Sequence, residues 1–434
     1  MPFRLKLTDP DFDAAFARLL GTKREVSEEV DGAAAVIMAD VRRRGDAALH
    51  DASLRFDRVD LDCLPLRIGP DEVAAAVEAA PKGARDALGF ARDRIVAYHE
   101  RQKPADLRYT DALGVDLGWR WRAIEAVGLY VPGGTASYPS SVLMNAVPAK
   151  VAGCSRVVMV VPSPDGVLNP LVLVAAQLAG VDEIYRVGGA QAVAALAYGT
   201  ETIAPVAKIV GPGNAYVAAA KRRVFGTVGI DMIAGPSEVV ILADATADPD
   251  WVAADLLAQA EHDAVAQSIL ITDDAAFAGT VEAAVMRQLA ALPRAAIAGA
   301  SWRDYGAIIQ VPRLSDAVPL VDRLAPEHLE IIAADEDALS EAITNAGAIF
   351  LGRHTPEAIG DYVGGSNHVL PTARSARFSS GLGVLDFMKR TSILRCDAAS
   401  LAALGPAAVA LGRAEGLDAH ADSVALRLGM PPRG

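Results

Sequence analysis

The sequence predicts an α/β protein with parallel β-sheets that are covered by helices. Between residues 155 and 352, short apolar runs of strand length alternate with longer Ala- and Leu-rich stretches, and glycine-rich turns join several strands to the helices that follow. Strands that alternate with helices form parallel sheets, because each helix returns the chain to the start of the next strand. At 434 residues the chain is too long for one ordinary core, so we expect two or more domains.

The expected elements follow one another in three blocks. Residues 1–25 form an arm or short helix, and helical patterns cover 30–56 and 70–101, the latter with a 3.6-residue rhythm. The second block has strands at 156–162, 183–187 and 208–210, with helices at 169–179, at 191–198 and ending near Phe225. The third has strands at 239–243, 268–272, 307–311, 329–333 and 348–352, and a helix at 249–262. Two α/β units joined near residues 231–238, with a helical tail over 381–434, account for this order.

Composition excludes several classes of protein. The net charge of −13 opposes nucleic-acid binding, which needs a basic surface. No uncharged apolar run approaches the ~20 residues that span a membrane, and charges interrupt the N-terminus where a signal peptide needs an apolar stretch. Cys63, Cys154 and Cys396 are far apart and odd in number, so no disulfide framework or thiolate zinc site is expected, and Cys154 is read as a small buried residue. We therefore expect a cytoplasmic protein.

Three glycine-rich turns indicate a nucleotide site. They are residues 128–134, 187–191 and 211–214, and the last two stand where a strand passes into a helix. Such turns let a phosphate or ribose approach the backbone, although each alone is also typical of an ordinary left-handed turn. None is the G-x-G-x-x-G dinucleotide fingerprint, since Tyr216 occupies the place of its last glycine.

Four polar islands carry the candidate chemistry. Gln259 and His262 share one face of a predicted helix; Glu327-His328, Asp361 and His420 follow along the chain. Imidazole, carboxylate and amide oxygens suit a zinc site with open positions, and a Glu-His pair suits acid/base catalysis. A solvated helix pair at Gln259 and a plain polar turn at Glu327 are the alternatives.

The position of the Glu-His pair and the other histidines each allow more than one interpretation. Glu327 and His328 precede their strand, whereas α/β proteins bind ligands beyond strand ends. The pair therefore reaches the site across a domain or subunit boundary, or its strand runs antiparallel. Among the other histidines, His50 and His99 lie in charged helical stretches and are expected on the surface, while His354 and His368 receive no role.

These motifs together resemble the histidinol dehydrogenase family, zinc enzymes that oxidise L-histidinol to L-histidine through the aldehyde with two NAD. The resemblance extends from residue 30 into the tail, and its markers are residues 127–134, 187–196, 211–216, 230–239, 259–262, 325–329, 360–371 and 415–420.

The resemblance implies a role for each matching residue. The zinc ligands, for one ion per subunit, would be Gln259, His262, Asp361 and His420. Glu327 would activate water and His328, neutral at pH 7, would accept the alcohol proton. NAD would lie near Tyr130, Gln191 and Asn214. The substrate would contact Ser237 and Glu415, together with the zinc ligands, Glu327 and His328.

The resemblance also implies the domain plan. Two Rossmann-like domains without the usual fingerprint would follow an N-terminal arm at 1–25. Residues 26–130 with 238–380 would carry the zinc and catalytic groups, and residues 131–237 would form the NAD side. The tail at 381–434 would cross a homodimer and complete the partner's active site. A zinc hydrolase that uses Glu327 as base remains the alternative enzyme. A non-catalytic nucleotide-binding relative would lack at least one key residue, and none is missing.

Overall fold

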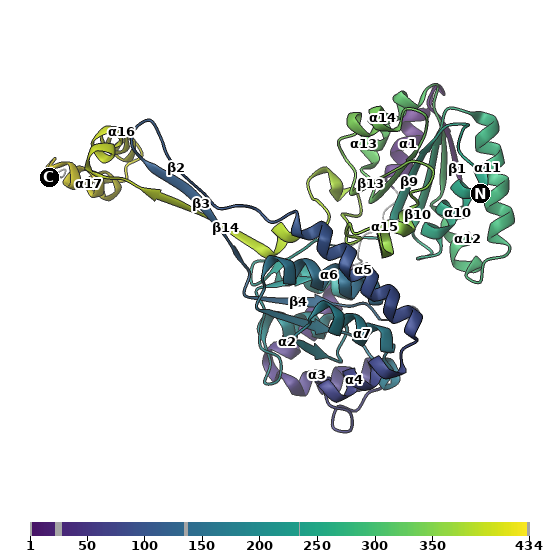
Figure 1. Cartoon of the computed structure of the whole chain (residues 1–434), viewed down its shortest axis with the longest axis horizontal. Helices are drawn as coiled ribbons and strands as arrows, with labels where there is room; N and C mark the ends of the chain where they lie inside the picture. Colours follow the sequence, from purple (N-terminus) through teal and green to yellow (C-terminus); the bar gives the residue numbers. More distant parts are fainter. Residues whose placement is uncertain (1, 22–27, 134–137, 234, 432–434) are drawn as a thin grey trace. The chain divides into compact units, whose positions relative to one another are not determined.

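The computed structural model describes residues 2–21, 28–133, 138–233 and 235–431 (Figure 1). The chain divides into two compact units. The first comprises Met1–Gln102 and Ile124–Phe387, and the second comprises Lys103–Ala123 and Met388–Gly434. The first unit contains two parallel sheets and the second an antiparallel one, so the chain has the α/β architecture with parallel-sheet domains that the sequence predicts.

The six-stranded sheet of the first unit is parallel throughout. Its strands, in spatial order, are β1 (Phe3–Lys6), β11 (Ala307–Gln310), β10 (Gln267–Thr272), β9 (Glu238–Ala243), β12 (His328–Ile332) and β13 (Ala348–Leu351). Side chains alternate between its two faces, so each face is covered by its own helices. One face packs on α1 (Phe12–Leu20), α13 (Val318–Leu324) and α14 (Glu336–Ala342). The other packs on α10 (Pro249–Ala260), α11 (Ala275–Leu289) and α12 (Ala295–Asp304).

The five-stranded sheet is also parallel and sandwiched by helices. Its order is β6 (Glu183–Tyr185), β5 (Arg156–Val160), β4 (Ala126–Tyr130), β7 (Lys208–Val210) and β8 (Gly229–Ile230). One core contains side chains of α2 (Glu28–Arg44), α3 (Asp46–Ala52), α8 (Gly189–Tyr198) and α9 (Ala215–Val224). A second group of mutually packed helices comprises α4 (Pro70–Ala79), α5 (Lys82–Glu100), α6 (Pro139–Ala152) and α7 (Pro170–Ala179). Figure 1 shows helices on both faces of this sheet.

The second unit is built on three antiparallel strands. Strand β14 (Met388–Arg395) pairs with β3 (Asp116–Ala123), which pairs with β2 (Leu107–Thr110). The chain then forms α16 (Ala398–Ala414) and α17 (Asp418–Ala425), which pack on each other around Val409, Ala421 and Ala425. Asp397 caps α16 in a capping box with Ser400, which satisfies backbone groups at the start of the helix.

The remaining helical segments are short. A π-helical turn covers Ser53–Asp57, and 3-10 turns cover Pro164–Gly166, Leu314–Ala317, Ser375–Arg377, Val384–Phe387 and Leu426–Leu428; α15 spans Glu357–Tyr362. Within the described part of the chain, no helix has the length and apolar character needed to cross a membrane.

The packing differs from the expected grouping in three places. Helices α2 to α5 belong with the five-stranded sheet, and β4 is its central strand, although the sequence analysis grouped residues 26–130 with 238–380. The N-terminal arm instead contributes an edge strand, β1, to the six-stranded sheet, with residues 22–27 outside the described part. The tail, expected to be helical, contains the eight-residue strand β14 before its two helices. An apolar stripe shows that an element packs, but not which distant partner it meets.

Candidate active site

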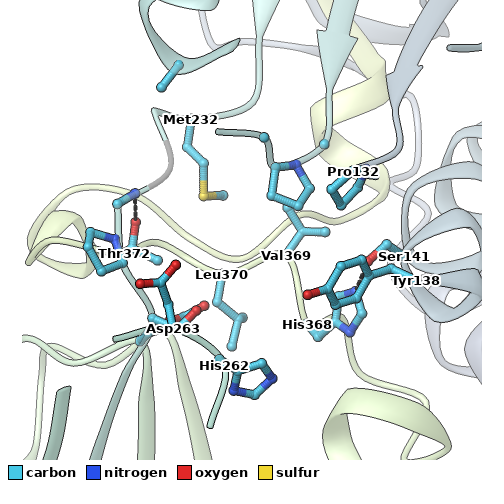
Figure 2. Close-up of a pocket in the computed structure, with 18 of the residues that line it drawn as sticks. Pro132, Tyr138, Ser141, Met232, His262, Asp263, His368, Val369, Leu370 and Thr372 are labelled. Atoms are coloured by element: carbon cyan, nitrogen blue, oxygen red, sulfur yellow. Dashed lines mark hydrogen bonds between the residues drawn. The ribbon is translucent and has the colours of Figure 1, made fainter. Parts of the chain in front are cut away.

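A cavity of about 630 Å³ lies in the first unit, between one edge of each parallel sheet. From the five-stranded sheet come residues that follow strand ends: Pro132 after β4 and Gly211–Asn214 after β7. From the six-stranded sheet come residues at strand starts, Ser237 before β9 and Glu327-His328 at β12. Figure 2 shows Pro132 and Met232 lining the same pocket as His262 and Asp263.

This arrangement explains why Glu327 and His328 precede their strand. Strand β12 runs parallel to both β9 and β13, so the antiparallel alternative is wrong. The carboxyl edge of the five-stranded sheet faces the amino edge of the six-stranded one across the cavity. A ligand that lies beyond the strand ends of the first sheet therefore meets the strand starts of the second.

The turn before β12 fixes the Glu-His pair. Helix α13 ends at Ala325, whose φ of +45° is left-handed, and Pro326 prevents the helix from continuing. The Glu327 Oε2 atom accepts a hydrogen bond from the Glu238 backbone N–H at 2.9 Å. His328 Nδ1 lies 3.2 Å from the Glu238 carbonyl oxygen, which makes Nδ1 the donor and leaves Nε2 without a hydrogen-bond partner. Both side chains are nearly fully buried.

Three carboxyl groups surround the His328 ring. Glu357 Oε2 and Glu327 Oε2 lie 3.8 and 3.9 Å from Nδ1, and Asp361 Oδ1 lies 3.5 Å from Nε2. Burial alone would lower the pKa of His328, but Glu357, Glu327 and Asp361 together raise it well above its ordinary value. The neighbouring carboxylates therefore favour the imidazolium form of His328, and a neutral His328 at pH 7 stays a prediction.

The pKa values of Glu327 and Asp361 shift in opposite directions at this site. Burial raises the pKa of Glu327 to about 7, with the charge of His328 opposing the rise. Burial would also raise the pKa of Asp361, but the His328 ring, with Nε2 3.5 Å from Oδ1, and its charge hold that pKa below its ordinary value. Glu327 thus has the pKa of a useful acid or base near neutral pH, and Asp361 remains an anion.

A cluster of buried acids behind His328 escaped the sequence analysis. Glu330 is on β12 and faces the same side as His328; its Oε1 atom accepts from the Glu357 backbone N–H at 2.6 Å, and its carboxyl group lies near that of Asp255 on α10. Burial raises the pKa of Asp255 to about 6 and of Glu357 to about 8, and that of Glu330 well above its usual range. Two signals in the sequence point to the cluster: an acid inside the apolar strand His328–Ile332, and Glu357 one helical turn before Asp361.

Three of the four expected metal ligands meet in the cavity wall. Gln259 is fully buried at the end of α10, with Nε2 3.2 Å from His262 Nδ1, and Asp361 lines the same cavity as both. Gln259 Oε1 is buried and has no hydrogen-bond partner. No preformed cluster of three or more His, Cys, Asp or Glu ligands occurs among the described residues. An unsatisfied amide oxygen beside an imidazole and a carboxylate nevertheless fits an N/O-coordinated metal such as zinc.

His368 is a further cavity residue, to which the sequence analysis gave no role. Its Nδ1 atom donates to the Asp361 carbonyl oxygen at 3.0 Å, and its Nε2 atom accepts from the Ser141 hydroxyl at 3.1 Å (Figure 2). Burial lowers the pKa of His368, so the ring is neutral and holds the Asp361 backbone in place. His99, expected on the surface, is fully buried and bonds the Ile95 carbonyl oxygen at 2.8 Å, so that expectation is wrong.

The three residues expected near NAD have different positions. Asn214 lines the cavity and caps α9, where its Oδ1 atom accepts from the Tyr216 and Val217 backbone N–H groups. Tyr130 and Gln191 are buried and do not line the cavity; the Tyr130 hydroxyl accepts from the Gly189 N–H at 3.0 Å. The Tyr130 hydroxyl thus holds the 187–191 turn, of which Gln191 is a part. Gly134, the last residue of the first glycine-rich turn, lies outside the described part.

Glu415 and His420 belong to the second unit. Glu415 follows α16 and His420 lies in the first turn of α17, and both are exposed there. Ser237, Gln259, His262, Glu327, His328 and Asp361 line the cavity of the first unit. The expected site residues are therefore divided between the two units.

Comparisons with known proteins extend over nearly the whole chain. A family model described as histidinol dehydrogenase matches residues 21–428. The histidinol dehydrogenase of Rhodopseudomonas palustris is 71% identical over 428 residues, covering 99% of both chains. That of Bradyrhizobium diazoefficiens is 70% identical over 430 residues, covering 99% of this chain and 100% of the relative. The crystal structure of histidinol dehydrogenase from Elizabethkingia anophelis matches with a TM-score of 0.94 at 35% identity, covering 99% of this chain and 98% of that one.

Proposed function

Because this chain belongs to the histidinol dehydrogenase family, we propose that it oxidises L-histidinol to L-histidine through L-histidinaldehyde, with two NAD as hydride acceptors. The observation that carries the proposal is the cavity itself. It sets the buried pair Glu327-His328 on one wall and the Gly211–Asn214 turn on the other. One wall holds groups that move protons, and the other is a glycine-rich strand end of the kind that binds nucleotides.

The first oxidation needs a base for the alcohol proton while hydride leaves the adjacent carbon for NAD. His328 Nε2 is the atom for this step, because Nδ1 is committed to the Glu238 carbonyl oxygen. Neutral His328 accepts the proton, and Asp361, Glu357 and Glu327 stabilise the imidazolium that forms. The carboxyl groups thus favour the charged product of the proton transfer.

The second oxidation needs water, since the acid contains one oxygen more than the aldehyde. Glu327 is the base for that water: Oε2 is held by the Glu238 N–H, and burial brings the pKa of the carboxyl to about 7. The hydrated aldehyde then loses a second hydride to another NAD. Overall, histidinol, water and two NAD give histidine, two NADH and protons.

Gln259, His262 and Asp361 would hold a zinc ion, with His420 as the fourth ligand. The buried, unpaired Gln259 Oε1 atom supports this assignment. A zinc ion held there would supply a Lewis acid that binds and orients the substrate. Ser237 in the cavity and Glu415 in the second unit would contact the substrate. We assign the second unit to a homodimer in which His420 and Glu415 of one chain complete the partner's site.

The test compares wild type with His328→Asn in the presence of histidinol, NAD and zinc. We expect the absorbance of NADH to rise with wild type. The variant should form NADH about 10²–10⁴-fold more slowly. Histidinol turnover by zinc-loaded protein without NADH formation would contradict the proposal and favour the hydrolase alternative. His354→Asn is the matched control, because His354 is exposed and does not line the cavity.

A further inference from the structure

A buried ion pair lies under the Gly211 turn. Lys221 on α9 and Asp231 after β8 are 2% and 1% exposed, and their side chains form a salt bridge. Both residues border the same cavity as Asn214. Neither has a part in the proton transfers proposed above, so the burial of two charges at this place calls for another cause.

The pair holds Gly211 on both sides of its backbone. The Gly211 N–H donates to Asp231 Oδ2 at 2.7 Å, and its carbonyl oxygen accepts from Lys221 Nζ at 2.9 Å. Gly211 has a φ of +107°, and a Cβ there would lie 2.2 Å from the Tyr130 carbonyl oxygen. The turn therefore requires glycine at this position, because any other residue would be strained and would clash with Tyr130.

Asp231 also fixes the chain that leaves the five-stranded sheet. Its Oδ1 atom accepts from the Met232 backbone N–H at 2.6 Å, as well as from Lys221. One carboxylate thus joins the Gly211 turn to the start of the segment that leads to Ser237. Burying an ion pair contributes little net stability, because desolvation offsets the attraction. Its effect is instead to hold three backbone groups in one geometry: the N–H and carbonyl oxygen of Gly211 and the N–H of Met232.

The pair does not offer its charge to a phosphate. Lys221 is neutralised by Asp231, and three N–H groups in the turn and the first turn of α9 already have partners: that of Gly211 bonds Asp231, and those of Tyr216 and Val217 bond Asn214. A phosphate bound as in ordinary dinucleotide folds needs such groups to be free. What Lys221 and Asp231 supply here is the shape of the turn.

We propose that Lys221 and Asp231 are positioning residues for NAD: by clamping Gly211 they hold residues 211–214 in the conformation that receives the dinucleotide. The inference rests on the proposed NAD-dependent function. It makes NAD affinity, and not histidinol binding, depend on two buried side chains that the nucleotide does not touch.

The direction in which Asp231→Asn changes the affinity for NAD distinguishes a positioning role from direct binding by Lys221. If Lys221 bound a phosphate directly, Asp231→Asn would release its positive charge and tighten NAD binding. If the pair positions the turn, the same change loosens Gly211 and weakens NAD binding. We expect the NAD dissociation constant to rise about tenfold in Asp231→Asn and in Lys221→Met, the effect of losing a charge-assisted hydrogen bond.

The double variant Lys221→Met/Asp231→Asn removes the destabilising effect of an unpaired buried charge. It should unfold at a higher temperature than either single variant and still bind NAD about tenfold more weakly than wild type. In all three variants the KM for histidinol and kcat at saturating NAD should stay within about twofold of wild type. These readouts distinguish a positioned turn from general loss of stability.

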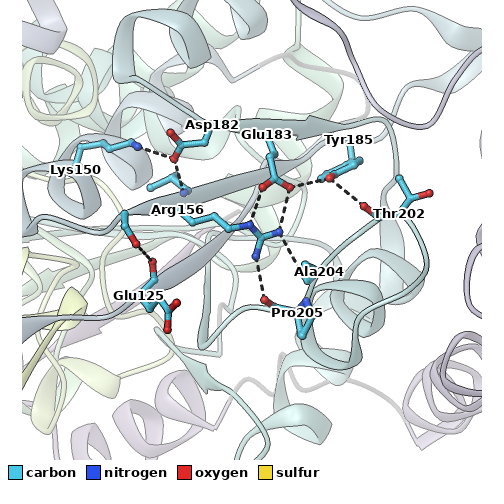
Figure 3. A network of polar contacts seen from close by, with 11 residues as sticks. Glu125, Lys150, Arg156, Asp182, Glu183, Tyr185, Thr202, Ala204 and Pro205 are labelled. Carbon is cyan, nitrogen blue, oxygen red and sulfur yellow. Dashed lines mark hydrogen bonds and ion pairs between the residues drawn. The ribbon is translucent and has the colours of Figure 1, made fainter.

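Arg156→Met is the matched control. Arg156 pairs with Glu183, with Arg156 Nε 2.7 Å from Glu183 Oε1, at the starts of β5 and β6, the edge of the same sheet opposite the cavity (Figure 3). Its loss should lower the unfolding temperature and leave NAD affinity unchanged. Tighter NAD binding by Asp231→Asn, or wild-type affinity in the double variant, would overturn the clamp. Wild-type protein that binds no NAD would overturn the proposed function itself.

Discussion

The Glu327 carboxylate is tied to the Glu238 backbone N–H at 2.9 Å, which joins the start of β12 to the start of the neighbouring strand β9. The Glu238 carbonyl oxygen lies 3.2 Å from His328 Nδ1. A single peptide segment of β9 thus orients both members of the Glu-His pair. The geometry of this pair comes from the register of β12 against β9, on which the two tasks proposed for Glu327 and His328 depend.

Glu327→Gln should separate the two half-reactions. Glutamine cannot deprotonate water, so oxidation of supplied histidinaldehyde should slow by about 10²–10⁴-fold, while the first hydride transfer from histidinol slows less. His328→Asn should show the reverse pattern. Single-turnover measurements with each substrate check this. Small and equal losses in both steps would assign the pair a structural role.

Metal content should depend on His262. His262→Asn removes one of the proposed ligands, so elemental analysis should find less than one zinc per chain, and turnover should fall with it. Strong chelators should abolish wild-type activity, and added zinc should restore it. Full activity of wild type shown to be metal-free would exclude a catalytic metal.

Glu330→Gln should stabilise the protein increasingly as pH rises. Burial raises the pKa of Glu330 and, to about 6, that of Asp255, so folding favours their protonated forms and stability is lost as pH rises above their unfolded values. Glutamine keeps the hydrogen bonds without a proton to lose. The gain in melting temperature should reach about 2–4 °C at about pH 8 and be smaller at about pH 5.

The exposed Glu341→Gln serves as the control for this measurement, because its side chain has no buried partner to lose. A gain for Glu330→Gln that is constant with pH, or a loss that grows with pH, would show that the buried acids are not held protonated.

If two chains share each active site, two inactive variants should restore activity when they form mixed dimers. His262→Asn and His420→Asn should each be inactive, and unfolding and refolding them together should restore about a quarter of native activity. Random mixing makes about half of the dimers mixed, and each mixed dimer has one intact site of two. No recovery in a mixture that refolds to dimers would contradict a site completed by the partner.

Much of the fold was predictable from the sequence because strands and helices have local signatures. The apolar runs at residues 208–210 and 239–243 are strands β7 and β9, and Asn169 caps the helix α7 where the pattern placed its start. Which strands pair with one another was not predictable. Pairing of β1 with β11 joins residues some 300 positions apart, and no local pattern in Phe3–Lys6 specifies it.

The candidate site was also predictable only in part. Residue types and spacing indicated Gln259, His262 and the Glu-His pair, and the structure gathers them around one cavity. The protonation of His328 was not predictable, because it depends on Glu357, one further carboxyl group that only the fold brings within 3.8 Å. His99 was misjudged for the same reason: charged neighbours in sequence do not reveal that a helix face is buried.

The proposed reaction is a four-electron oxidation completed in one cavity. The number of NADH formed for each histidine tests this most directly. Purified, zinc-loaded protein given histidinol and excess NAD should form two NADH for each histidine, with no free histidinaldehyde captured by an added carbonyl reagent. One NADH for each histidinol consumed, with histidinaldehyde as the released product, would contradict the account.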